Sequence, residues 1–277
     1  MYYIIFCRKK KVHMLSFSLF LYFLDSQRDF FWIFLFPRRR KCAKIVSTPK
    51  KEAAATETAR KAAELFRQYG KRFEFPCGAE LYNSVVQQNR GVACFLESGS
   101  CSLSGLTWDG KQQIFLYSHG PRLVGFTQHM PAVQRGDEPH IIITAKTSCV
   151  VYQMGGELFA RLLQQEPLFQ TYVMQILAEN YVDLLRHYQS SQSQCATARL
   201  CTFLLNYAQQ EGGRLCMPAY FTLSEVSHYL GVHTVTVSRI VAQLRQRGYI
   251  EKEGRRVILL DPDGLGQLVK EHANFDF

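Results

Sequence analysis

The sequence predicts an α+β protein: a β jelly-roll barrel, then a long helix, then a winged helix-turn-helix. Three observations predict it. Short apolar stretches separated by turn residues every 8–12 positions fill residues 71–153, a spacing typical of a β-sandwich or jelly roll. After Gly155-Gly156 the apolar period becomes helical. Residues 223–247 then follow the spacing of a helix-turn-helix.

Composition excludes disorder but does not by itself indicate a nucleic-acid partner. The 277 residues are 47% hydrophobic and 20% charged, enough apolar material for one or two packed domains. The net charge is +10. Residues 1–50 hold 11 Lys/Arg and 2 Asp, giving +9, whereas the remaining residues hold 22 basic and 21 acidic side chains, giving +1. The charge therefore belongs to the N-terminal segment.

Residues 1–48 form an atypical basic and aromatic tail. Its apolar runs at 14–24 and 30–37 are shorter than the ~18 residues of a membrane span. No small-x-small cleavage site of a signal peptide follows them. Three interpretations stay open: a start assigned upstream of the true one (for instance near Val46), a membrane-associating segment, or a folded element.

Residues 49–156 are predicted to form an effector-sensing barrel domain. An Ala/Glu/Arg-rich helix over 50–69 would dock through Leu65 and Phe66. Asp109-Gly110 is suited to a hairpin turn, because both residues tolerate positive φ. The expected strands include 73–75, 92–96, 102–106, 114–117, 141–143 and 149–152.

Residues 157–194 are predicted to be helical and to contain a dimerisation helix. A short helix ends near Pro167, and a longer one carries an apolar stripe for about five turns. The stripe is wider than one neighbour needs. It either packs on its own barrel or pairs with a symmetry mate, with Asn180 as a register-setting polar residue.

Residues 195–277 are predicted to form the DNA-binding domain. Ser227 must be small because the second helix crosses close to it, and Gly231 supplies a left-handed turn. The matching apolar positions are Val226, Leu230, Val232, Val237 and Ile240.

The second helix of this motif is predicted to enter the major groove. Arg239 would bond guanine, and a following strand–turn–strand wing would bring Arg255 and Arg256 to phosphate. Residues 233–256 hold six Lys/Arg and two Glu, a local charge of +4. Protein-binding winged helices share this shape and are the alternative. The predicted DNA-binding residues are Thr222, Ser224, His233, Thr234, Val235, Thr236, Ser238, Arg239 and Arg255.

This combination resembles the Crp–Fnr family of transcription regulators over residues 70–265. The resemblance is carried by Phe95-Leu-Glu-Ser-Gly-Ser with Asp109-Gly110, and by Leu230-Gly-Val-His-Thr-Val-Thr-Val-Ser-Arg239. It implies a cyclic-nucleotide-binding-like barrel in a cytoplasmic homodimer, which binds a near-palindromic site on double-stranded DNA. It also implies RNA polymerase and a small-molecule effector as partners.

The resemblance further implies that the effector is not a cyclic nucleotide. The positions that would hold ribose and phosphate resemble Leu123-Val-Gly-Phe126 and Pro139-His140, without the expected acidic residue and Arg. The recognition helix is most similar to the branch that regulates reductive dehalogenation, whose effectors are halogenated phenolics. By that likeness the effector-binding residues would be Tyr117, Phe126, Leu177, Asn180 and Tyr181.

Two alternatives add chemistry to the same chain. A cupin-like metal-dependent enzyme fused to a DNA-binding unit would need clustered histidines, but His119, His129 and His140 are ten or more residues apart. A thiol redox switch would use Cys195 or Cys201 near the domain junction. The scattered cysteines are more typical of buried thiols in a reducing compartment. We therefore expect no catalytic residues, metal or cofactor.

Overall fold

The computed structural model describes residues 3–8, 11–16, 49–86, 91–106, 110–130, 140–254 and 256–271. The chain divides into two units, Met1–Val46 and Ser47–Phe277. In the first, β1 (Tyr3–Arg8) pairs antiparallel with β2 (Lys11–Ser16). Most of the apolar run 14–24, and all of 30–37, lie outside the described residues. No helix within the described ranges is long and apolar enough to cross a membrane.

The second unit begins with helix α1 (Pro49–Tyr69), which covers one side of the barrel domain. Leu65 and Phe66 are buried, which confirms both as docking residues. Thr58 Oγ1 donates a 3.0 Å hydrogen bond to Gln175 Oε1, and Lys61 pairs with Glu166 at 3.1 Å. The helix is therefore fixed to the helical segment that follows the barrel.

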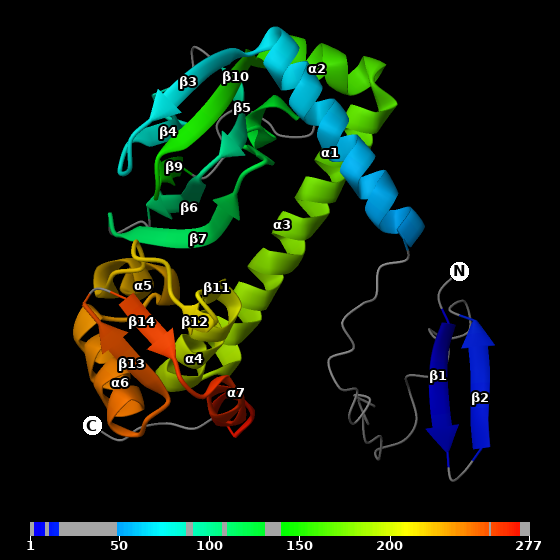
Figure 1. Cartoon of the computed structure of the whole chain (residues 1–277). Coiled ribbons are helices and arrows are strands. Elements are labelled where there is room, and N and C mark those ends of the chain that lie inside the picture. The colour runs from blue at the N-terminus through cyan, green and yellow to red at the C-terminus, as the bar shows by residue number, and fades with distance from the viewer. Residues whose placement is uncertain are drawn as a thin grey trace. The chain divides into compact units, whose positions relative to one another are not determined.

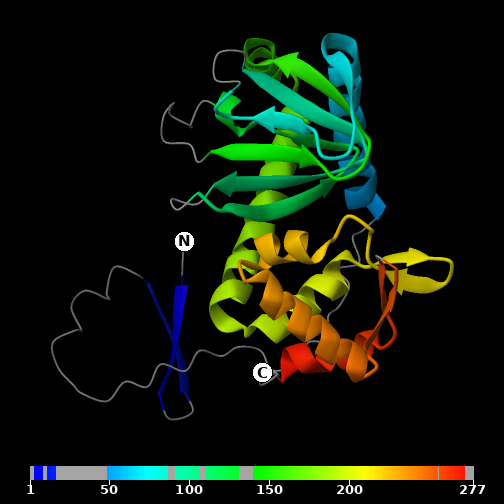
Figure 2. The same ribbon diagram turned by 90° about the vertical axis from the view of Figure 1, so that its left-hand side faces the viewer.

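Two four-stranded antiparallel sheets form the barrel, as the sequence predicted (Figures 1 and 2). One sheet has the order β3-β10-β5-β8 and the other β4-β9-β6-β7. β4 and β8 lie outside the apolar stretches that were predicted as strands. The strands are β3 (Lys71–Phe75), β4 (Glu80–Asn83), β5 (Val92–Ser98), β6 (Ser100–Leu106), β7 (Gln112–His119), β8 (Arg122–Val124), β9 (Ile141–Ala145) and β10 (Cys149–Gly155).

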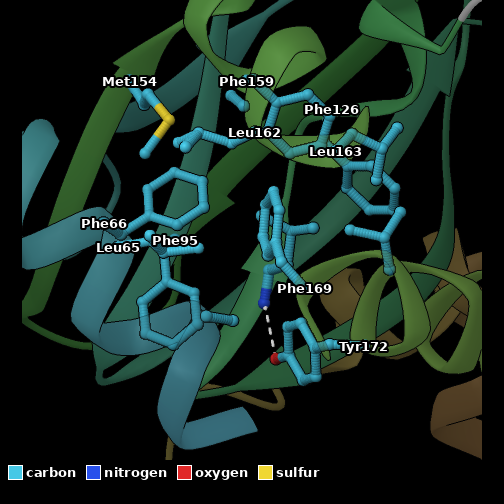
Figure 3. Close-up of a cluster of buried hydrophobic side chains, with 14 of the residues drawn as sticks. Leu65, Phe66, Phe95, Phe126, Met154, Phe159, Leu162, Leu163, Phe169 and Tyr172 are labelled. Atoms are coloured by element: carbon cyan, nitrogen blue, oxygen red, sulfur yellow. Dashed lines mark hydrogen bonds between the residues drawn. The ribbon is translucent and has the colours of Figure 1, made fainter. Parts of the chain in front are cut away.

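An aromatic core joins this barrel to the helices around it (Figure 3). Phe66 of α1 stacks on Phe95 of β5 with ring centroids 5.5 Å apart. Phe159, from α2 (Gly156–Gln165), and Phe169 pack edge to face at 5.4 Å. The Tyr172 hydroxyl accepts a 3.3 Å hydrogen bond from the Leu123 backbone N–H, drawn as the dashed line. Barrel, α1, α2 and the next helix thus share one core.

That next helix, α3 (Pro167–Ser193), has two apolar faces along different parts of its length. Its first turns bury Phe169, Tyr172, Val173 and Ile176. Other apolar side chains of the helix are exposed, most of them farther along. These exposed residues are Leu168, Met174, Tyr181, Val182, Leu184, Leu185 and Tyr188.

The C-terminal domain packs its helices around one apolar core, with a four-stranded sheet at its edge. The sheet order is β11-β12-β14-β13. Val237, Ile240 and Leu244 are fully buried in the core. The elements are α4 (Ala196–Tyr207), β11 (Gln209–Glu211), β12 (Arg214–Cys216), α5 (Leu223–Leu230), α6 (Thr234–Gln246), β13 (Ile250–Glu253), β14 (Arg256–Leu259) and α7 (Pro262–Lys270).

Candidate nucleic-acid interface

Helices α5 and α6 form the helix-turn-helix, and each local feature has a residue that causes it. Thr222 caps α5 by accepting a 3.1 Å hydrogen bond from the Glu225 backbone N–H. Gly231 ends α5 at φ 62° and ψ 36°, the left-handed conformation that favours glycine. Thr234 Oγ1 then donates to Ser227 Oγ at 3.1 Å, which ties the first residue of α6 back to α5.

The outer face of α6 exposes a polar and small-apolar set. Val235 has half of its surface exposed (51%), and Ser238 and Arg239 lie one turn farther along on the same exposed face. The imidazole of His233 caps the helix, since its Nδ1 accepts a 3.3 Å hydrogen bond from the Val235 backbone N–H. This face offers methyl groups, a hydroxyl and a guanidinium, the groups that read base edges.

Two arginines on this helix are free to meet an anion. Within the described ranges, Arg239 and Arg245 form no ion pair, and both are exposed. The wing differs, because Arg256 pairs with Glu211 at 2.6 Å and Arg214 with Glu253 at 2.7 Å. Arg239 and Arg245 of α6 can therefore meet phosphate without first leaving a carboxylate, whereas Arg214 and Arg256 cannot.

The predicted DNA-binding residues differ in exposure in the structure. Thr222 and Ser224, at the start of α5, are exposed. Thr234 and Thr236 are half-buried, and Thr234 is engaged with Ser227. Arg255, expected on the wing, lies outside the described residues.

The five predicted effector residues do not share one site. Phe126 is buried in the barrel core, and Leu177 packs against that core. Asn180 accepts a 2.9 Å hydrogen bond from Arg122 Nη2, so it faces its own barrel. Tyr181 is exposed (63%). Tyr117 lies elsewhere, against the core of the helix-turn-helix.

Sequence reasoning missed the groups that meet Tyr117. Its hydroxyl donates a 3.0 Å hydrogen bond to Glu225 Oε1, and Lys146 Nζ lies 2.7 Å from the same oxygen. Burial and the Glu225 charge raise the pKa of Tyr117, so the phenol keeps its proton. Thr222-x-x-Glu225 has the spacing of a capping box, but the carboxylate turns to the barrel instead. No local signal shows that choice.

The geometry gives little support to the thiol redox switch or to the metal-dependent enzyme. Burial raises the pKa of the Cys201 thiol to about 12, which removes the thiolate that a redox switch needs. Cys195 is half-buried at the N-cap of α4. In the part of the chain that the structure describes, no three His, Cys, Asp or Glu side chains gather as metal ligands.

Comparisons with known proteins agree with this geometry. Residues 198–268 match the Crp-like helix-turn-helix domain. The chain is 26% identical to the transcriptional activator protein FnrA of Stutzerimonas stutzeri over 178 residues, covering 61% of this chain and 69% of FnrA. These regulators, which are not enzymes, give the metal-enzyme alternative no support.

Two solved structures share the fold. FixK2 from Bradyrhizobium japonicum superposes with a TM-score of 0.58 at 19% identity, covering 75% of this chain and 99% of that one. CprK complexed with OCPA superposes with a TM-score of 0.51 at 18% identity, covering 74% of this chain and 92% of that one. Together these likenesses establish the barrel and the helix-turn-helix.

Proposed function

Because the chain is a transcription regulator of the Crp–Fnr family, we propose that it binds a near-palindromic DNA site as a homodimer under the control of a small-molecule effector. One observation carries the proposal: the exposed face of α6 presents Val235, Ser238 and Arg239 beside a second unpaired arginine, Arg245. A recognition helix needs such a face to read base edges while its opposite face packs in the core.

Binding assays with Arg239→Ala test this role. Loss of a bidentate contact to guanine makes the free energy of DNA binding less favourable by about 1–3 kcal/mol and relaxes specificity at that base. The variant should therefore lose about 5- to 150-fold of its preference for the selected site over random duplex and keep weaker, salt-sensitive binding. Arg161→Ala, an exposed arginine on α2, is the matched control and should change neither quantity. Undiminished discrimination by Arg239→Ala would contradict the proposal.

We propose that the homodimer forms through the exposed stripe of α3. Met174, Tyr181 and Tyr188 recur every seven residues, with Leu185 between the last two. This is the spacing of a two-helix seam, in which side chains at positions 3–4 residues apart face a partner helix. The residues of α3 that face the barrel are different ones, so both faces can be used together.

We further propose that the effector is a small aromatic molecule, not a cyclic nucleotide, and that the regulator acts on RNA polymerase in the cytoplasm. The likeness of His233–Arg239 to the reductive-dehalogenation branch favours a halogenated phenol. The aromatic core between Phe126 and Leu177, beside the Arg122–Asn180 hydrogen bond, is the proposed region. Tyr117 lies apart from it.

Thermal unfolding of the full chain with a chlorinated phenol tests this part. A ligand present at about 100 times its Kd adds ~2.7 kcal/mol to the free energy of unfolding. We expect the chlorinated phenol to raise Tm more than phenol or cyclic AMP does. A rise with cyclic AMP alone would reject the halogenated-phenol proposal.

A further inference from the structure

A polar and aromatic seam joins the barrel to the helix-turn-helix. We define the barrel–helix seam as Tyr117 of β7, Lys146 after β9, and Glu225 of α5. Lys146 Nζ lies 2.7 Å from Glu225 Oε1, and the two side chains are only 14% and 13% exposed. Tyr117 donates to the same oxygen at 3.0 Å. Two barrel residues thus hold one carboxylate of the DNA-binding domain.

The ring of Tyr117 also completes the aromatic core of that domain. It packs edge to face on Phe221 and Tyr207, with ring centroids 4.9 and 5.2 Å away. The ring centroids of Phe203 and Tyr229 lie 6.5 and 5.6 Å away. Such aromatic pairs are directional, because edges and faces carry opposite partial charge. The domain is therefore docked at a defined angle, not simply tethered by the chain.

Direct contacts couple the orientation of α5 to that of α6, the proposed recognition helix. Glu225 lies in the first turn of α5, and Ser227 of the same helix accepts the hydrogen bond from Thr234, the first residue of α6. Val237 and Ile240 of α6 are fully buried in the core that α5 shares. A rotation of α5 on the barrel would therefore turn α6 with it.

We propose that the barrel–helix seam fixes the spacing of the half-sites that the dimer recognises. The inference rests on the proposed function, since it needs two recognition helices on one DNA site. One turn of DNA spans ~34–36 Å over ~10–10.5 base pairs, so two extra base pairs move a half-site by ~7 Å and ~70°. A domain docked at one angle cannot follow that shift, whereas a released domain can.

Selection from a random duplex library tests the inference without knowledge of the effector. The wild-type protein should select two half-sites at one spacing and lose affinity at least tenfold when two base pairs are inserted. Tyr117→Ala opens the aromatic contact, and Tyr117→Phe combined with Lys146→Met removes the polar bonds but keeps the ring. Both variants should select the same half-site as the wild type. Inserting two base pairs should lower their affinity less than threefold. Tyr69→Ala, at an exposed tyrosine of α1, is the matched control and should behave as wild type.

The possible outcomes distinguish failure of the inference from failure of the proposed function. If both variants bind a single half-site within twofold of wild type yet keep its spacing preference, the inference is overturned. If they lose half-site binding as well, the seam maintains the domain itself and does not set spacing, which also overturns it. If the wild-type protein selects no motif, the proposed function fails, and the inference fails with it.

Discussion

Replacing Gly231 with alanine should destabilise the protein through backbone conformation alone. A Cβ at this position would meet no atom nearer than 3.9 Å, so no side chain has to move. An L-residue in the left-handed region costs about 1–2 kcal/mol. Alanine also restricts the unfolded chain, which stabilises the folded state by about 0.4–1 kcal/mol. The free energy of unfolding should therefore fall by about 0.8 kcal/mol, the middle of the resulting range of about 0–1.6 kcal/mol.

Urea unfolding followed by circular dichroism measures this change, with two companion variants as references. Gly266 lies inside α7 without positive φ, and no atom lies within 4 Å of the position that an alanine methyl group would take. Gly266→Ala should therefore stabilise, by about 0.5–1 kcal/mol. Gly231→Asn should cost less than Gly231→Ala, because asparagine tolerates the left-handed region. If Gly231→Ala and Gly266→Ala shift stability in the same direction, the turn does not adopt the described conformation.

Three further predictions concern the dimer, the thiols and pH. Leu185→Lys should place a charge in the helix stripe, shift sedimentation towards monomer and weaken binding to the paired site more than to a half-site. In mass-spectrometric mapping of alkylated native protein, the exposed Cys77 should react long before Cys201, whose thiol is buried; equal rates would contradict the packing. Burial, and then the charge of Arg199, lowers the pKa of His187 below its ordinary 6.5. The unfolded chain therefore takes up a proton that the folded chain does not. Stability should fall as pH drops below about 6.5, and less so in His187→Gln.

The helix-turn-helix could be predicted because its determinants are local. Val226, Gly231 and Ile240 lie within one short segment, and their spacing alone requires a turn between two packed helices. The barrel was predicted from turn spacing, but its strand order and the short β8 were not, because pairing joins distant residues.

The seam could not be predicted for the same reason. Tyr117 and Glu225 are 108 positions apart, and each has an ordinary local explanation, as a strand tyrosine and as a capping-box glutamate. The sequence left open which neighbour Asn180 meets, because helical period alone cannot tell which neighbour covers which face. Its hydrogen bond to Arg122 shows that its face is the intramolecular one.

The ion pairs Arg256–Glu211 and Arg214–Glu253 affect how many cations are taken up and released when the protein binds DNA. Each pair spans an intervening strand, since Arg256 of β14 reaches Glu211 of β11 and Arg214 of β12 reaches Glu253 of β13. On a duplex, these arginines would exchange a carboxylate for a phosphate. The glutamates then have to recruit cations from solution, which offsets the cations that DNA sheds. A titration of affinity against salt should therefore count the arginines of α6 and miss Arg214 and Arg256.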